Sequence, residues 1–312
     1  MITFDAAKDI FKTPFFDLIF RARSVHVERN DANVIQVSTL FSIRTGGCCE
    51  DCAYCAQSIK NGTKFPKQII TNVDTALEAA KQAKKLGSSR FCIGASGRSP
   101  DPQVFEIACQ AVTKVKELGL ETCLTMGALN EEQVIELKNR GLDYYNHNVD
   151  TSPEYYDKII TTRTIEERLQ TIKLVQKHKI KVCTGGILGI GETNDDRIKM
   201  LTLLANLDEQ PSSISINRLV KVPGTRLKDS PEIDPFDFVR CVALARILMP
   251  QSIVRVSAGR ETMSDELQAL CFFAGASAIF GGDKLLTTAN VDPEADLRLM
   301  QRLNLQLPRI RR

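Results

Sequence analysis

The sequence predicts an α/β fold, a (β/α)8 TIM-type barrel with an N-terminal helical extension and a short C-terminal tail. From about residue 34 onward, short runs rich in β-branched residues alternate with longer amphipathic runs. Eight such units can close a parallel sheet on itself. The length of 312 residues suits a one-domain barrel. We expect 1–33 to form the helical extension, 34–288 the barrel, and 289–312 a C-terminal helix and basic tail.

Each expected strand is a short, mostly apolar run, and each expected helix has apolar residues three and four positions apart. The expected strands are 34–43, 90–95, 121–126, 144–150, 181–187, 213–220, 253–258 and 276–280. The expected helices are 72–86, 103–118, 131–140, 164–178, 195–207, 235–249 and 264–274. Gly87, Gly119 and Gly141 each follow a helical run, where glycine suits the left-handed position after a helix end.

The composition is that of a globular protein without a nucleic-acid or membrane role. Lys and Arg (41) nearly balance Asp and Glu (38), which leaves a net charge of +3, so nucleic acid is not expected as a main partner. No apolar run approaches the length of a membrane span, and no cleavage site follows the short apolar patch near the start. We expect a cytoplasmic protein, in which the ten cysteines serve metal binding or catalysis before disulfides.

The most informative motif is a group of cysteines at 48, 52 and 55, with aromatic Tyr54 before the last of them. The spacing C-x3-C-x2-C offers three thiolates to one metal centre. A cubane iron–sulfur cluster normally takes four cysteines, so three leave one iron open to a ligand that is not protein. The motif therefore indicates a metal centre with a site for chemistry.

Strand parity predicts a second set of inward-facing groups. Successive strand residues point alternately to the helices and to the lumen, and apolar neighbours that belong against helices turn the following four side chains inward: Cys92, Cys123, Cys183 and Arg255. A single buried cysteine is usually a small core residue, and a buried arginine most often pairs with a carboxylate. Three inward thiols beside a cluster motif favour a second metal site. The cysteines expected only to pack within helices are Cys109, Cys241 and Cys271.

The fourth expected strand carries an unusual polar face. Asn146, Asn148 and Asp150 lie two residues apart and project to one side, whereas His147 lies on the other, where we expect it to be packed and hydrogen-bonded. Asn217 on the sixth strand adds another amide. Such groups suit a small molecule with ring N–H and C=O groups, and the alternative is a closed internal hydrogen-bond network.

A glycine-rich run, from Gly185 to Glu192, closes the fifth expected strand. Glycines allow the backbone to approach a ligand closely. The run lacks the Lys-Ser/Thr ending of a Walker loop and the spacing of a dinucleotide fingerprint. We therefore do not interpret it as either motif.

These residues resemble a known family. C-x3-C-x-aromatic-C resembles the signature of the radical S-adenosylmethionine superfamily, and Gly185-x-Ile187-x-Gly189-x-x-Glu192 is similar to its adenine-side motif. More narrowly, the chain looks like the biotin synthase family in GGCCEDCAYCAQS, SSRFCIGA, GLDYYNHNVDTSPEYY, IITTRT, KVCTGGILGIGET, VRVSAGRE and KLLTT. These segments run in order from about residue 40 to residue 288.

The resemblance implies a sulfurtransferase with two clusters that catalyses the last step of biotin biosynthesis. A [4Fe-4S] cluster on the cysteine triplet would bind S-adenosyl-L-methionine, whose cleavage gives a 5'-deoxyadenosyl radical that abstracts hydrogen from dethiobiotin. A [2Fe-2S] cluster would donate the sulfur; its implied ligands are Cys92, Cys123, Cys183 and Arg255. An arginine ligand requires a neutral or partly deprotonated guanidinium. The resemblance also implies a homodimer and an electron donor such as flavodoxin with its reductase.

The resemblance further implies binding roles for single residues. The amides expected at the ureido ring of dethiobiotin are Asn146, Asn148 and Asn217. The residues expected at S-adenosyl-L-methionine are Tyr54, Asn148, Asp150, Arg168, Gly185, Ile187, Gly189 and Glu192. Arg168 would face the methionine carboxylate, although its helical position is also compatible with a surface charge.

The chain departs from the family pattern in two places. Cys49 stands where the family usually has proline, so a fourth thiol lies beside Cys48. The chain also stops soon after the last expected barrel strand, where many relatives continue.

Two other interpretations stay open at this point. One is a radical enzyme of the methylornithine- or hydrogenase-maturation type. The other is an iron–sulfur electron carrier or zinc module, and three cysteines without a second pair fit zinc poorly.

Overall fold

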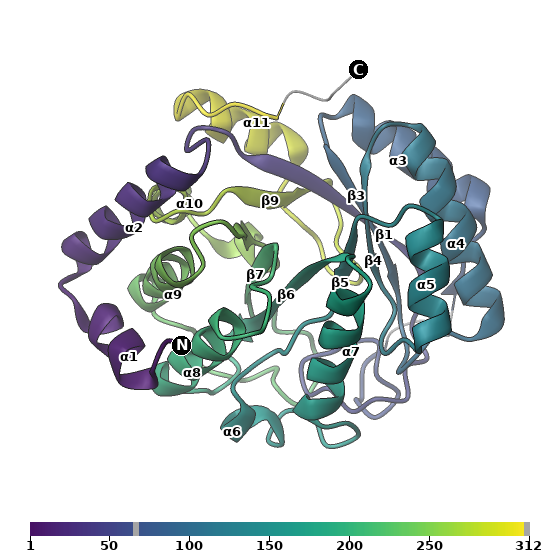
Figure 1. The fold of residues 1–312 in the computed structure, drawn as a ribbon, viewed down its shortest axis with the longest axis horizontal. Helices are drawn as coiled ribbons and strands as arrows, with labels where there is room; N and C mark the ends of the chain where they lie inside the picture. Colours follow the sequence, from purple (N-terminus) through teal and green to yellow (C-terminus); the bar gives the residue numbers. More distant parts are fainter. Residues whose placement is uncertain (65–68, 309–312) are drawn as a thin grey trace.

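The computed structural model describes residues 1–64 and 69–308, and its centre is a closed barrel (Figure 1). Eight strands in this part of the chain pair in parallel in the order β1-β3-β4-β5-β6-β7-β8-β9, and β1 also pairs with β9. Short β2 adds to β1 in the antiparallel sense. The strands are β1 (Gln36–Thr45), β2 (Ile69–Ile70), β3 (Arg90–Ala95), β4 (Glu121–Thr125), β5 (Tyr144–Asn146), β6 (Lys181–Leu188), β7 (Ser213–Arg218), β8 (Ile253–Val256) and β9 (Ala278–Gly281).

Helices surround the barrel on its outer side (Figure 1). They are α1 (Phe4–Lys12), α2 (Phe15–Arg29), α3 (Val73–Lys85), α4 (Pro102–Glu117), α5 (Glu131–Asn139), α6 (Pro153–Tyr156), α7 (Ile165–Lys177), α8 (Asn194–Ala205), α9 (Pro235–Leu248), the 3-10 helix η1 (Arg260–Thr262), α10 (Asp265–Phe273) and α11 (Pro293–Arg302). Side-chain caps fix several starts; Thr164 of α7 and Thr193 of α8, for example, each form a reciprocal capping box. None of the helices in the described residues has both the length and the apolarity needed to cross a membrane.

The predicted (β/α)8 barrel is confirmed, with each of its eight strands and seven helices present to within a few residues. The fourth predicted strand is shorter than expected, because regular pairing stops at Asn146. Beyond it the chain still follows β6, where the amides of His147 and Val149 donate to Cys183 O (2.9 Å) and Gly185 O (3.0 Å). Asp150 then adopts a left-handed φ of 67°. The division at residues 33 and 288 remains a prediction, and the end of the basic tail, 309–312, lies outside the described residues.

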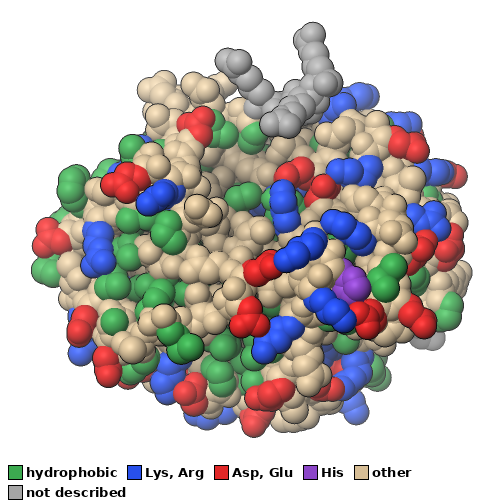
Figure 2. Space-filling view, in the orientation of Figure 1, with side chains coloured by type: hydrophobic (Ala, Val, Ile, Leu, Met, Phe, Trp, Pro, Cys, Tyr) green, Lys and Arg blue, Asp and Glu red, His purple; other side chains and the backbone are tan. Residues whose placement is uncertain are grey.

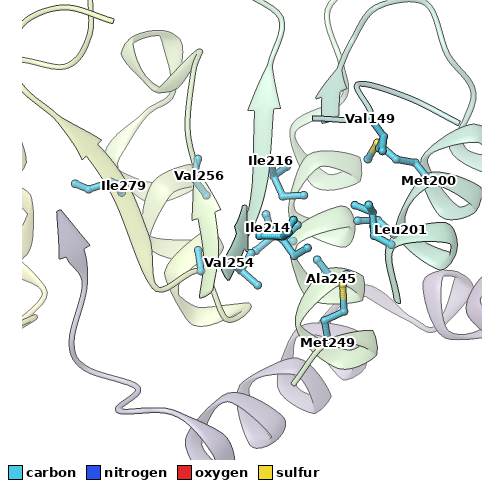
Figure 3. Close-up of a cluster of buried hydrophobic side chains, with 14 of the residues drawn as sticks. Val149, Met200, Leu201, Ile214, Ile216, Ala245, Met249, Val254, Val256 and Ile279 are labelled. Atoms are coloured by element: carbon cyan, nitrogen blue, oxygen red, sulfur yellow. The ribbon is translucent and has the colours of Figure 1, made fainter. Parts of the chain in front are cut away.

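The apolar core lies between the outer face of the barrel and the helices. Figure 3 shows Ile214 and Ile216 of β7 and Val254 of β8 pointing toward Leu201 of α8 and Met249 just after α9. All are buried. Each such side chain contributes about 1.5–3 kcal/mol by leaving water. The alternate residues of the same strands point to the lumen, so packing of the helices fixes which groups face the interior.

Figure 2 shows cationic and acidic side chains interspersed over one face of the molecule. This distribution agrees with the small net charge of +3. Several lysines form ion pairs with carboxylates at the surface, such as Lys116 with Asp143 (2.9 Å) and Lys179 with Glu209 (2.6 Å). Exposed pairs of this kind contribute little to stability.

The N-terminal helix α2 packs on α9 and buries a histidine without partners. His26 is fully buried, and neither ring nitrogen has a hydrogen-bond partner. Burial, together with the charges of Arg246 and Arg23, lowers the pKa of His26 to about 3. Arg246 itself donates to backbone carbonyls, including those of Gly275 (2.9 Å) and Ser252 (2.8 Å). The junction therefore tolerates only a neutral imidazole.

Because the unfolded chain binds a proton at His26 near pH 6.5 and the folded chain only near pH 3, stability is lost as the pH falls through this window. Each such group contributes a slope of about 1.4 kcal/mol per pH unit. His26→Leu should remove this share of the slope between about pH 5.5 and 4.5. Urea unfolding of the variant and of the wild type at the two pH values measures it. An unchanged slope in His26→Leu would contradict the interpretation.

Candidate functional site

A cavity of about 370 Å³ occupies the barrel at the carboxyl ends of its strands. Its walls include the loop after β1, which carries the cysteine triplet, and the segments after β5, β7 and β9. In barrels of this kind, loops at the carboxyl ends of the strands form the active site. The lining of the cavity also continues down into strand residues, so it joins the rim to the lumen.

The cysteine triplet lies at the rim of this cavity. Cys48, Cys52 and Cys55 all line it as free thiols, whereas Cys49 is exposed and does not. The loop is closed by backbone bonds, in which Cys48 N donates to Gln57 O (3.0 Å). The three thiols therefore face one space, as the spacing predicts.

Burial opposes ionisation of these thiols. It raises the pKa of Cys52 to about 12, with the Asp150 carboxylate adding to the effect, and raises that of Cys55 to about 11. Only a cationic centre bound to sulfur would make thiolates favourable here. Within 1–64 and 69–308, no three His, Cys, Asp or Glu side chains have the arrangement of a site for a single metal ion.

The inward-facing set lies deeper, on the strands themselves. Its four members are buried and line the cavity: Cys92, Cys123, Cys183 and Arg255. Cys92 and Cys123 are register partners on β3 and β4. A hydrogen bond from the Cys123 thiol lowers the pKa of Cys92 below its usual value. The parity argument is thus confirmed for the direction of these side chains.

Arg255 is not paired with a carboxylate among the described residues. Its Nη2 donates to Ser38 Oγ (2.9 Å) and to Gln36 Oε1 (3.1 Å), both on β1. Its Nε is buried without a partner. Gln36 in turn donates to Glu121 (2.9 Å). The guanidinium is therefore anchored through one nitrogen and has no carboxylate partner. Such a group suits a position beside an anionic group in the lumen.

Asp150 is the centre of a buried charged network. Its Oδ2 accepts from the Tyr54 hydroxyl (2.8 Å) and lies 2.7 Å from Nη2 of Arg168. Arg168 also donates to the Tyr156 hydroxyl (2.6 Å) and to Asn148 O (2.8 Å). Burial alone would lower the pKa of Arg168, but the Asp150 carboxylate raises it above its usual value. The surface-charge alternative for Arg168 is wrong, because α7 turns this residue into the barrel.

The amides differ in how far the protein already uses them. Asn217 donates to Gly186 O (2.9 Å) and accepts from Ala258 N (3.2 Å), so both ends of its amide are occupied. Asn146 and Asn148 line the cavity, and Asn148 Oδ1 is buried without a partner. The internal-network alternative therefore describes the bonds of Asn217, although this residue also lines the cavity, whereas Asn148 Oδ1 is an acceptor that no protein group uses.

The glycine-rich run shapes the site more than it lines it. Ile187 reaches the cavity, but Gly185, Gly189 and Glu192 are not among its lining residues. Glu192 accepts from the amides of Gly189 (2.9 Å) and Ile190 (2.7 Å) and pairs with Arg197 (2.6 Å). A Cβ at Gly186 would lie 2.5 Å from Asp150 O. The glycines thus let the segment that carries Asp150 approach β6.

His147 differs from the expectation in part. It is buried and stacks on Tyr145 with ring centroids 6.2 Å apart, so it is packed as expected. Its Nε2 has no hydrogen-bond partner, and the residue also borders the cavity. Burial lowers its pKa well below the usual value, so the ring stays neutral.

Sequence reasoning missed several lining residues. Glu50 and Arg163 border the cavity and pair at 3.1 Å. The segment after β9 contributes side chains from Leu285 to Thr288. The sequence holds a signal for each of these two regions. Two adjacent acidic residues lie inside the cysteine motif, and two threonines lie in the KLLTT segment directly after the last strand.

Comparison with known proteins agrees with this geometry. Residues 42–204 match the model of the Radical SAM superfamily, and residues 215–306 match the Biotin and Thiamin Synthesis associated domain. A biotin synthase of Lawsonia intracellularis is 54% identical over 97% of this chain and 96% of its own length. A biotin synthase of Rickettsia felis is 52% identical over 97% of this chain and 98% of its own length.

Solved structures show the same fold at low identity. Methylornithine synthase (PylB) superposes with a TM-score of 0.82 at 17% identity, covering 99% of this chain and 95% of its own. The hydrogenase maturase HydG from Carboxydothermus hydrogenoformans gives 0.82 at 16%, covering 98% of this chain and 76% of its own. These likenesses concern the barrel alone. The extent and identity of the sequence matches, together with the two cysteine sets in one cavity, show that the chain belongs to the biotin synthase family of radical S-adenosylmethionine sulfurtransferases.

Proposed function

We propose that two different clusters act in this cavity on dethiobiotin. A [4Fe-4S] cluster is held by Cys48, Cys52 and Cys55 with S-adenosyl-L-methionine at its open iron, and a [2Fe-2S] cluster is held deeper by the inward-facing set. The observation that carries the proposal is that both cysteine sets line one cavity. The donor chemistry fits, because thiolates are the usual ligands of such clusters and three leave an iron open.

When bound, the first cluster supplies the electron that cleaves S-adenosyl-L-methionine, and the second supplies sulfur to the carbon that loses hydrogen. The protein's own task is placement. Tyr54, Asp150 and Arg168 form a fixed polar wall beside the triplet. Such a preorganised set orients a charged cofactor without further ordering.

The free amides would orient the substrate. Asn146 and Asn148 line the cavity, and their amide groups carry the kinds of donor and acceptor that match the C=O and N–H groups of a urea ring. Asn217 acts through its bonds to Gly186 O and Ala258 N, which hold β6 and the end of β8 beside it. Ile187 adds an apolar contact at the rim.

The proposal includes an electron donor such as flavodoxin with its reductase. Exposed cationic side chains beside the cysteine loop, among them Lys60, Lys64 and Arg226, support a donor with an acidic docking face. A homodimer and a cytoplasmic location are further parts of the proposal, and they rest on the family resemblance.

Separate cysteine variants test the two-cluster assignment. Reconstituted wild-type protein should hold about six irons per chain, one cubane plus one two-iron cluster. Cys52→Ala should lose 5'-deoxyadenosine formation with dithionite and S-adenosyl-L-methionine. Cys92→Ala should still form 5'-deoxyadenosine but no biotin, because only the sulfur source is removed. Cys241→Ala, a buried helix residue, serves as control. Wild-type biotin yield from Cys92→Ala would refute the assignment.

Asp150→Asn tests the charged network. The change leaves Arg168 buried without its counter-charge, so the free energy of unfolding should fall by about 3–5 kcal/mol. Binding of S-adenosyl-L-methionine, measured by equilibrium dialysis, should weaken as well.

Tyr54→Phe removes one hydrogen bond and should lower the free energy of unfolding by about 1 kcal/mol. Equal stabilities of Asp150→Asn and wild type would argue against a network role.

Asn148 and Asn217 should respond differently to truncation. Asn148→Ala removes an acceptor that the protein does not use, so stability should be unchanged while the KM for dethiobiotin rises about tenfold, equivalent to about 1.4 kcal/mol. Asn217→Ala breaks two backbone contacts and should lower the urea midpoint. Identical effects of both variants on stability would contradict this division.

A further inference from the structure

Two adjacent carboxylates lie inside the cysteine loop, at Glu50 and Asp51. Negative charge beside three thiolates is unfavourable, so these residues require strong partners. Glu50 is 2% exposed and lines the cavity. Their partners lie in the loop before α7, more than a hundred residues away in the sequence.

Asp51 binds the start of that loop. It accepts from the amide of Thr161 (2.9 Å), from its hydroxyl (2.6 Å) and from the amide of Thr162 (3.3 Å). The amide of Asp51 donates back to Thr162 Oγ1 (3.2 Å). The side chain and the backbone of Asp51 therefore both fix this segment.

Glu50 binds the rest of the same segment. Its carboxylate lies 3.1 Å from Nε of Arg163 and 3.3 Å from Nη1 of Arg98, and it accepts from the Thr162 hydroxyl. Arg98 also donates to Thr162 O (2.5 Å). The Arg163 side chain is only 7% exposed and borders the cavity, and its charge acts on Cys52. Glu50 thus sets the position of a cation beside a thiol.

The backbone continues this contact on either side. Ala53 N donates to Ile159 O (2.9 Å). Arg226 donates both to Ile159 O (3.1 Å) and to Asp51 O. The part of the loop between Cys49 and Cys52 is therefore held mainly by segment 159–163.

We propose that Glu50 and Asp51 are positioning residues that hold the cysteine triplet against segment 161–163, which acts as a template for the cluster loop. The inference rests on the proposed cluster at Cys48, Cys52 and Cys55. Neither carboxylate touches the reacting atoms; both act through the threonines and through Arg163.

Iron release from the holoprotein tests this role. In a Cys92→Ala background, which keeps only the rim cluster, Glu50→Gln and Asp51→Asn should release iron to a chelator 10–100-fold faster, the usual effect of losing a partner of metal ligands. Glu131→Gln, a surface carboxylate paired with Lys177, is the matched control. The electron paramagnetic resonance signal of the reduced cluster should also change. Glu50→Gln leaves buried Arg163 without its counter-charge, so it should also lower the melting temperature of the cluster-free protein.

Thr162→Val provides a second, milder variant that removes only the hydroxyl between the two carboxylates. The effects of Thr162→Val and Glu50→Gln on the rate of iron release should be less than additive in the double variant, because both changes break the same hydrogen bond. Release rates equal to the control would overturn the inference. So would an unchanged electron paramagnetic resonance signal in both carboxylate variants, which would assign the residues to folding alone. A wild-type chain that binds no rim cluster would instead refute the proposed function.

Discussion

Alternation of side chains along a closed ring of parallel strands is the constraint on which the rest of this structure depends. On β7 and β8, Ile214 and Val254 are buried against helices, which turns Ser215 and Arg255 to the lumen as register partners. A shift of one residue would exchange these faces and bury polar groups among the helices. Helix packing outside the barrel thereby determines the chemistry inside it.

The second determinant is the approach of the segment after β5 to β6. Gly186 leaves room for the backbone of Asp150, whose carbonyl accepts from Ile187 N (2.8 Å). This contact aims the Asp150 carboxylate at Tyr54 and Arg168. The missing Cβ atom of Gly186 thus allows the cysteine loop, the polar strand and α7 to join in a single network.

Properties that depend on local pattern could be predicted from the sequence. The strands, the inward direction of Cys92 and the polar face of Asn146 and Asn148 follow from a period of two, and all three agree with the structure. Properties that depend on distant partners could not be predicted in this way. The helical period placed Arg168 on α7 but did not reveal that Asp150 lies opposite it.

The same limit applies to the amides and to the cysteine loop. Asn217 was expected at the substrate or, as the alternative, in an internal hydrogen-bond network, and its bonded partners are backbone groups that only the folded barrel brings close. The pairing of Glu50 with Arg163 spans two loops, and nothing in either segment alone specifies it.

The two cysteine sets also differ in what holds them. Cys92, Cys123 and Cys183 are fixed by the hydrogen-bonded ladder of the barrel, the most cooperative part of such a fold. Cys48, Cys52 and Cys55 lie on a loop whose conformation depends on its contacts with neighbouring segments, such as 161–163. Heat, oxidants and chelators should therefore disturb the rim set of cysteines before the set on the strands, so that ageing protein loses the geometry of its loop while the barrel thiols are still in place.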